Sequence, residues 1–207
     1  MTRESDTHAI GISKQRLEAL SDGVYSVALT LLVLDLKLPV KSYSGSNEAL
    51  LEALYGLLPN LLTWLLSFYV LTIYWLAQAR LYRLTKEVDP FMVRAAFAEL
   101  ALISLLPFST SLIGEHGSHI AAAAIYSLNL LGIATLSLTR TTHVLNHPLL
   151  HENHLPTSLD RNLRLAVWIR LWCSVATLGL AFLYPGWNMF AMLPVALLPY
   201  FLRHAHR

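Results

Sequence analysis

Long, predominantly apolar stretches recur along the chain, and each is long enough to cross a lipid bilayer as a helix. A bilayer span requires about 20 such residues, and the first stretch, residues 16–39, reads RLEALSDGVYSVALTLLVLDLKLP. Apolar residues make up 55% of the chain and charged residues 14%, whereas soluble domains carry about 25% charge. These runs predict an all-α, polytopic membrane protein.

Five clusters of proline, glycine and polar residues interrupt the apolar runs and therefore divide the chain into six predicted helices. The helices are expected over residues 14–38, 48–83, 90–113, 118–145, 159–183 and 187–203. The second is longer than a bilayer requires, so its first two turns, ending near Pro59, are expected outside the hydrocarbon. We interpret residues 1–207 as one six-helix transmembrane unit.

Lysine and arginine predict the orientation, because cytoplasmic loops of membrane proteins are enriched in both. If both termini are cytoplasmic, only Lys37 and Lys41 lie at the outer side. The other thirteen lie at or near the cytoplasmic side: Arg3, Lys14, Arg16, Arg80, Arg83, Lys86, Arg94, Arg140, Arg161, Arg164, Arg170, Arg203 and Arg207. This asymmetry also accounts for the sequence pI near 8.7, so a nucleic-acid partner is not expected.

Asp22 is the most informative polar residue of the first helix, because a charge at depth normally faces a partner or a watery cavity. Arg16 lies about 240° away around the helix and is a poor partner at about 100° per residue. The second helix runs back through the bilayer and brings Trp75 and Gln78 to a matching depth. Both carry N–H donors. Two interpretations remain: a polar clamp between helices, or a direct role for Asp22 in moving ions or protons.

Two stripes follow Asp22 along the first helix. Val27, Leu31 and Leu34 form an apolar stripe, and Asp22, Ser26 and Thr30 form a weakly polar stripe beside it. Such apolar stripes are usually packing surfaces, and serine and threonine in membrane helices often bond their own carbonyls. Spacing alone therefore does not identify a pore. Asp35 at the outer end is either a solvated carboxylate or a group that attracts cations.

Two blocks of residues resemble the endolysosomal potassium channel family of the transmembrane protein 175 type and its prokaryotic homologues. RLEALSD at 16–22 resembles the Arg-x-x-x-Phe-Ser-Asp signature that opens the family's first helix. LLPFSTSLIGEHG at 105–117 resembles a Leu-Pro-Phe-Ser-Thr element, and the run 67–83 more weakly resembles the family's second helix. The resemblance covers the first half of the chain.

The resemblance implies a potassium-selective cation channel without the TVGYG filter, a motif that this sequence also lacks. It implies four six-helix subunits around one pore in a prokaryotic plasma membrane, with potassium as the permeant ion and no cofactor. Carried over by position, Val27, Leu31 and Leu34 would form apolar constriction rings, and Thr30 a hydroxyl ring that discriminates potassium from sodium. Arg16, Ser21 and Asp22 would tie the helix to its neighbours, and Asp35 would lie at the outer mouth.

Four positions depart from the family pattern. One of them is Val27, which is smaller than the isoleucine or leucine expected there, so the tightest ring would be wider or lie at Leu31. Leu20 replaces the phenylalanine of the signature, Gln78 stands where a histidine is expected, and Ala96 stands where many relatives have asparagine. Because Gln78 and Ala96 alter the expected hydrogen bonds around Asp22, these departures concern gating and pH response more than the fold.

Other interpretations remain at this stage. A secondary or proton-coupled transporter is the main alternative, although no repeat relates the two halves of the chain. An enzyme is not expected, since no nucleophile accompanies Asp22, Glu99 and Gln78. No metal is expected: Cys173 is the one cysteine, and the histidines of HVLNHPLLHENH (143–154) fit a solvated loop better than a zinc site. Glu99 and Asn129 are expected to bond neighbouring helices, with a proton relay as the alternative for Glu99.

Overall fold

The computed structural model describes residues 12–37, 46–147, 150, 157–195 and 197. Within these ranges the protein is helical and contains no strand. The elements are α1 (Lys14–Leu31), η1 (Leu32–Asp35), α2 (Asn47–Gly56), α3 (Leu58–Leu84), α4 (Pro90–His116), α5 (Ile120–Asn146), α6 (Thr157–Leu183) and η2 (Asn188–Met192). Five of the described helices are long and apolar enough to cross a membrane: α1 with η1, α3, α4, α5 and α6.

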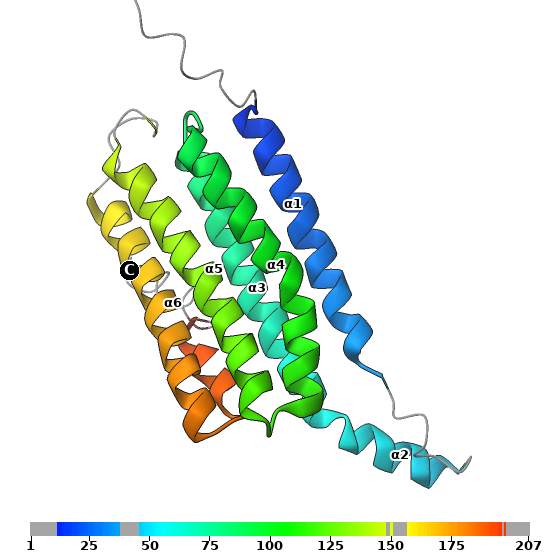
Figure 1. Cartoon of the computed structure of the whole chain (residues 1–207). Helices are drawn as coiled ribbons and strands as arrows, with labels where there is room; N and C mark the ends of the chain where they lie inside the picture. Colours follow the sequence, from blue (N-terminus) through cyan, green and yellow to red (C-terminus); the bar gives the residue numbers. More distant parts are fainter. Residues whose placement is uncertain (1–11, 38–45, 148–149, 151–156, 196, 198–207) are drawn as a thin grey trace, which may run out of the picture.

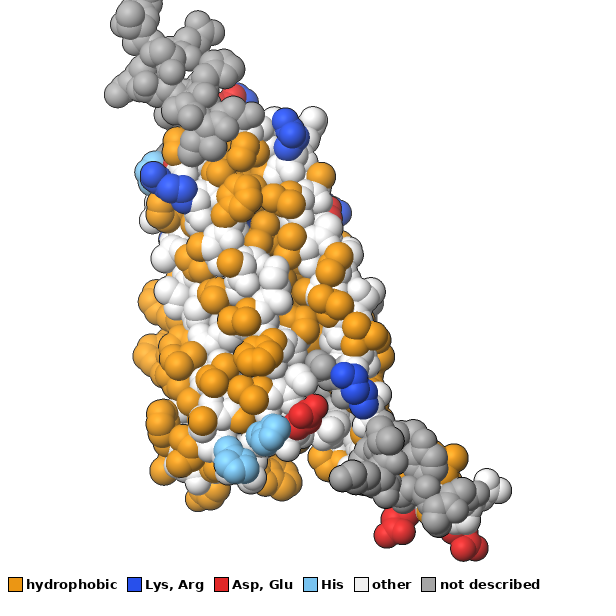
Figure 2. Space-filling view, turned by 45° about the vertical axis from the view of Figure 1, so that its right-hand side comes forward, with side chains coloured by type: hydrophobic (Ala, Val, Ile, Leu, Met, Phe, Trp, Pro, Cys, Tyr) orange, Lys and Arg blue, Asp and Glu red, His pale blue; other side chains and the backbone are white. Residues whose placement is uncertain are grey.

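The long helices lie side by side in one bundle, with α1 at one edge and α6 at the other (Figure 1). α5 packs between α4 and α6, and α1 packs against α3 and α4. A core of leucine, isoleucine, alanine and tyrosine side chains runs through the bundle and includes Tyr25, Tyr74 and Tyr126. The face of the bundle seen in Figure 2 carries many hydrophobic side chains along its length, as a surface facing lipid requires.

The sequence predicts one helix over 48–83, and the structure has two. Pro59 has no N–H to donate, and its ring crowds the carbonyl of Tyr55, so the helix breaks at Leu57. Ser46 caps α2 by accepting from Ala49 N at 3.2 Å. As a result, α2 turns away from the bundle beyond the end of α1 (Figure 1).

The other bounds lie close to those predicted. The first helix is α-helical to Leu31 and continues as a 3₁₀ turn to Asp35, rather than reaching Leu38. Of the sixth predicted span, 187–203, the described part forms η2 and a short helical segment over residues 193–195. Residues 196 and 198–203 lie outside the described residues, so the sixth span stays a prediction.

Candidate functional site

α1 has one face inside the bundle and one face outside it. Leu17, Ser21, Tyr25 and Ala28 are buried against α3 and α4, and Leu32 continues this face into η1. This helix therefore packs through less than half of its circumference.

The three apolar residues predicted as pore rings lie on the uncovered face. Val27 is 56% exposed, Leu31 40% and Leu34 60%. A groove of about 410 Å³ runs along this face, with Leu20, Gly23, Val27 and Leu31 among its lining residues and Ser104 of α4 on its other side. The sequence-predicted stripe is thus a free apolar surface of the single chain.

Thr30 lies on the same face and is exposed. Its hydroxyl donates to Val27 O at 2.8 Å, and the oxygen can still act as an acceptor. Asp35 ends η1, but its side chain lies outside the described residues.

In the N-terminal half of α1, Asp22 contacts α3. Trp75 Nε1 donates to Asp22 Oδ1 at 2.9 Å, so the pairing that depth predicts is present. Ser21 Oγ donates to Leu17 O at 2.8 Å and lies 3.3 Å from the hydroxyl of Tyr82. Arg16 is exposed in the first turn of α1, where its backbone N–H is capped by Ser13 Oγ. Two side chains of the signature thus join α1 to α3.

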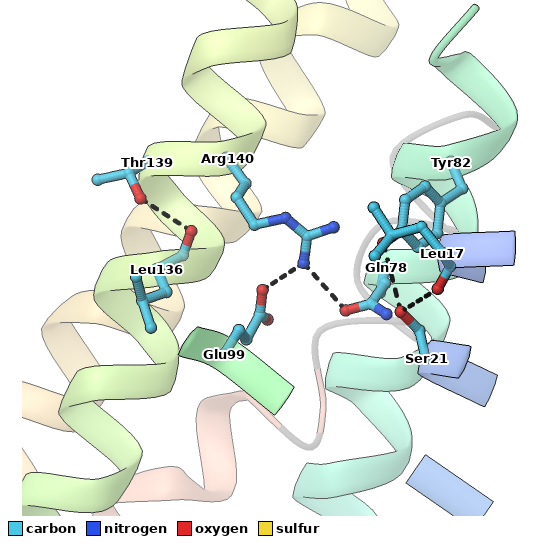
Figure 3. A network of polar contacts seen from close by, with 8 residues as sticks. All are labelled: Leu17, Ser21, Gln78, Tyr82, Glu99, Leu136, Thr139 and Arg140. Atoms are coloured by element: carbon cyan, nitrogen blue, oxygen red, sulfur yellow. Dashed lines mark hydrogen bonds and ion pairs between the residues drawn. The ribbon is translucent and has the colours of Figure 1, made fainter. Parts of the chain in front are cut away.

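Gln78 does not bond Asp22; it belongs to a network inside the bundle. Arg140 of α5 donates through Nη1 both to Gln78 Oε1, at 3.1 Å, and to the carboxylate of Glu99 on α4 (Figure 3). Arg140 is 1% exposed and Glu99 2%. The guanidinium also lies over the ring of Tyr82, 5.4 Å from its centroid, which connects the network to Ser21. Glu99 therefore has the interhelical bond that the sequence predicts.

Arg140 and Arg170 are two residues whose position sequence reasoning missed. Both belong to the cytoplasmic set in the orientation argument, yet both are buried in the bundle. Arg170 donates through Nε to Ala166 O at 3.2 Å and lies 5.3 Å from the centroid of the Tyr74 ring. Their position within long apolar segments is the signal that could have marked them as interior charges.

Within the part of the chain that the structure describes, no three His, Cys, Asp or Glu side chains form a group that could hold a metal ion. His143 Nε2 lies 2.7 Å from Asp89 Oδ2, and the rings of His143 and His147 are 4.2 Å apart. His151 and His154 lie outside the described residues. Asn129 makes its predicted interhelical contact by donating to Ser109 Oγ at 3.1 Å.

These features define a multi-pass helical membrane protein with a free, largely apolar face on its first span. A family model described as "Endosomal/lysosomal potassium channel TMEM175" matches residues 16–107. The chain belongs to this family, which is a family of ion channels and not of enzymes. The matched region includes the signature at the start of α1, the α3 residues Trp75 and Tyr82 that contact it, and α4 as far as Pro107.

Similar proteins agree with this assignment. A potassium channel of Streptomyces collinus is 32% identical over 140 residues, which are 62% of this chain and 66% of that protein. A potassium channel of Chamaesiphon minutus is 34% identical over 122 residues, 58% of this chain and 60% of that protein. The matched regions thus span somewhat less than two thirds of these relatives. The mouse endosomal/lysosomal proton channel TMEM175 is 35% identical over 112 residues, 50% of this chain and 22% of that protein.

One solved structure matches nearly the whole chain. The crystal structure of a lysosomal potassium-selective channel TMEM175 homologue from Chamaesiphon minutus has a TM-score of 0.70 and 26% identity, covering 94% of this chain and 98% of the other. The likeness therefore extends to the second half, beyond the region that the family model matches.

Proposed function

We propose that this protein is a potassium-selective channel in which several copies, four by resemblance to the family, place their α1 helices around one pore. The observation that carries the proposal is the uncovered face of α1, on which Val27, Leu31 and Leu34 are exposed while the opposite face is fully packed. This face borders a groove of about 410 Å³ between α1 and α4 that the described part of the subunit leaves unfilled. Several such faces turned inward would enclose a narrow apolar conduit.

The chemistry of this face suits a hydrophobic gate. An apolar constriction can close a pore by losing its water, without a charged plug. Thr30 would add one hydroxyl oxygen per copy beside the Val27 and Leu31 rings, and its exposure supports that role. Potassium holds its hydration water less tightly than sodium, so a narrow, weakly polar constriction favours potassium. TVGYG, the filter sequence of other potassium channels, is not needed for this mechanism.

The proposed anchor of the pore helix is the contact from Asp22 to Trp75, together with Ser21 and Tyr82. These bonds join α1 to α3 near the cytoplasmic end, while the outer end of α1 is a 3₁₀ turn. Asp35 would face the outer mouth in this arrangement and concentrate cations there. The proposed location is the plasma membrane of a prokaryote, with both termini in the cytoplasm.

Protons are a second candidate permeant ion, because the vertebrate relatives are named proton channels. With the outer solution at lower pH than the lumen, a proton conductance would acidify the lumen of a vesicle that contains no potassium on either side. A pH-sensitive dye inside potassium-free proteoliposomes measures it directly.

The test is potassium flux from proteoliposomes, with sodium as the competing cation. Leu31→Ala should raise the flux about tenfold, which corresponds to a barrier lower by about 1.4 kcal/mol. Thr30→Ala should reduce the preference for potassium over sodium. Matched controls are Leu165→Ala on α6 and Thr135→Ala on α5, both exposed on other helices, which should change neither property. If wild type conducts and the α1 variants behave like these controls, α1 does not line the pore.

A further inference from the structure

Arg170 is a buried cation at the centre of a candidate membrane span. It is the middle residue of α6, so about 20 Å of helix separates it from either end, at about 1.5 Å per residue. It is 4% exposed. A charge at such a depth normally pairs with an opposite charge. In the described part of the chain the ion pairs involve Arg140, His143 and Arg164, and none involves Arg170.

The buried charges of the bundle do not balance. Among the described side chains Glu99 is the one buried carboxylate, whereas Arg140 and Arg170 are both buried cations. Glu99 is already paired with Arg140. One positive charge is therefore left over in the interior. Because an ion taken out of water is costly without an opposing charge, the excess favours an anion as the missing partner.

Several hydrogen-bond donors on these side chains are also without a partner. Both bonds of the Arg140 guanidinium drawn in Figure 3 leave from Nη1. Nε and Nη2 of Arg140, Nη1 of Arg170 and the hydroxyl of Tyr25 are buried and bond no other group of the described protein. Guanidinium nitrogens only donate, and a tyrosine hydroxyl can donate. These atoms thus form a set of donors that lacks an acceptor.

Tyr25 connects the two arginines. It lies on the buried face of α1, and Glu99, Arg140 and Arg170 are all close enough to act electrostatically on its hydroxyl. Arg170 also lies over the ring of Tyr74, another electrostatic neighbour of Tyr25, at 5.3 Å from the ring centroid. The unpartnered donors come from α1, α5 and α6 and belong to one region of the interior.

We infer that the donor cluster of Tyr25, Arg140 and Arg170 binds a small monovalent anion such as chloride. One negative charge offsets the one excess positive charge. Hydrogen bonds between a guanidinium and an anion are stronger than neutral ones, and a monatomic anion accepts from several directions at once. A water molecule accepts about two bonds and brings no charge. Because the donor atoms are buried, an ion as large as gluconate is not expected to reach them.

The chloride dependence of thermal stability tests this site. The full-length protein is unfolded by heating in detergent at constant pH, while sodium chloride replaces sodium gluconate at constant ionic strength. A ligand that binds only the folded state raises the unfolding midpoint as its concentration rises. We expect a rise of about 4 °C for each tenfold increase in chloride above its Kd. A midpoint independent of chloride is the result expected if water occupies the cluster, and it would overturn the anion site.

Two variants locate the binding within the bundle. Arg170→Gln removes the excess charge and should abolish the dependence on chloride. Tyr25→Phe removes one donor but keeps the ring, and should raise the apparent Kd for chloride about tenfold, as the loss of one hydrogen bond to a charged partner predicts. A dependence like that of wild type in either variant would contradict the assignment. Since each variant decides separately, one that fails to fold leaves the other decisive.

The matched control is Tyr126→Phe. Tyr126 is also a buried tyrosine, but its hydroxyl lies 3.1 Å from Ser67 Oγ and outside the donor cluster. This variant should unfold at a different temperature from wild type and keep the same dependence on chloride. The measurement involves no ion flux, so its outcome is independent of the proposed channel function.

Discussion

At the scale of single residues, the ion pair of Glu99 and Arg140 places two opposite charges inside the bundle. Both side chains are almost fully buried. Arg140 Nη1 donates a second hydrogen bond, to Gln78 Oε1. Removing charges from water costs several kcal/mol for each ion, and a close partner offsets that cost. The sequence showed that Glu99 needs a partner. It did not show which one, since the candidates lie on several helices.

Glu99→Gln should therefore be strongly destabilising, because it leaves Arg140 buried without an opposing charge. We expect a loss of about 3–5 kcal/mol in the free energy of unfolding, measured as the apparent unfolding midpoint in detergent micelles. Asp160→Asn is the matched control: Asp160 pairs with Arg164 at 3.0 Å on the partly exposed start of α6, and such pairs contribute about 0.5 kcal/mol or less. Equal losses in the two variants would contradict the buried-pair account.

At the scale of elements, helix ends are tied to neighbouring helices by single side chains. Asp89 caps α4 by accepting from Met92 N at 2.8 Å through Oδ1, while Oδ2 contacts His143 in the last turn of α5. One carboxylate thus stabilises the start of one helix and attaches it to the end of another. The VDP stretch (88–90) marked this helix start in the sequence, but the contact with His143 depends on how α4 and α5 pack.

Two substitutions of Asp89 separate these roles. Asp89→Asn retains a capping oxygen and should cost a few tenths of a kcal/mol for the cap itself, whereas Asp89→Ala removes the cap and should cost about 1–2 kcal/mol. The comparison is made by thermal unfolding at pH 8, with His143→Gln measured in parallel for the contact to α5. If Asp89→Ala were no worse than Asp89→Asn, the cap would not contribute to stability.

At the scale of the whole molecule, the orientation of the bundle in the membrane determines which end of α1 faces the cytoplasm. The described residues contain five candidate spans, and a sixth would return the C-terminal side to the cytoplasm. The excess of lysine and arginine at one end of the bundle predicts that this end is cytoplasmic. Lys37 after η1 and Lys86 after α3 lie at opposite ends of the spans.

Labelling of single cysteines in intact cells tests this orientation. In a Cys173→Ser background, Lys37→Cys should react with a membrane-impermeant maleimide from outside. Lys86→Cys should react only after the cells are permeabilised. A reporter fused after residue 207 should behave like Lys86→Cys if six spans are present, and like Lys37→Cys if there are five. The reverse pattern for the two lysine positions would invert the assignment of the pore's inner and outer ends.

The spans, their approximate limits and the depth of the polar residues follow from the order of amino acids alone. A bilayer imposes a length and an apolar composition on each segment, and helical rise converts residue number into depth. Depth was enough to name Trp75 and Gln78 as candidate partners of Asp22, and the structure shows Trp75 as the partner. Depth was not enough to place Gln78 with Arg140 or to show that Arg170 is interior, because these contacts depend on the rotation and tilt of each helix. Those angles are set by packing among distant helices. The uncovered face of α1 is likewise decided by the tertiary structure, because it depends on which side of α1 packs against α3 and α4.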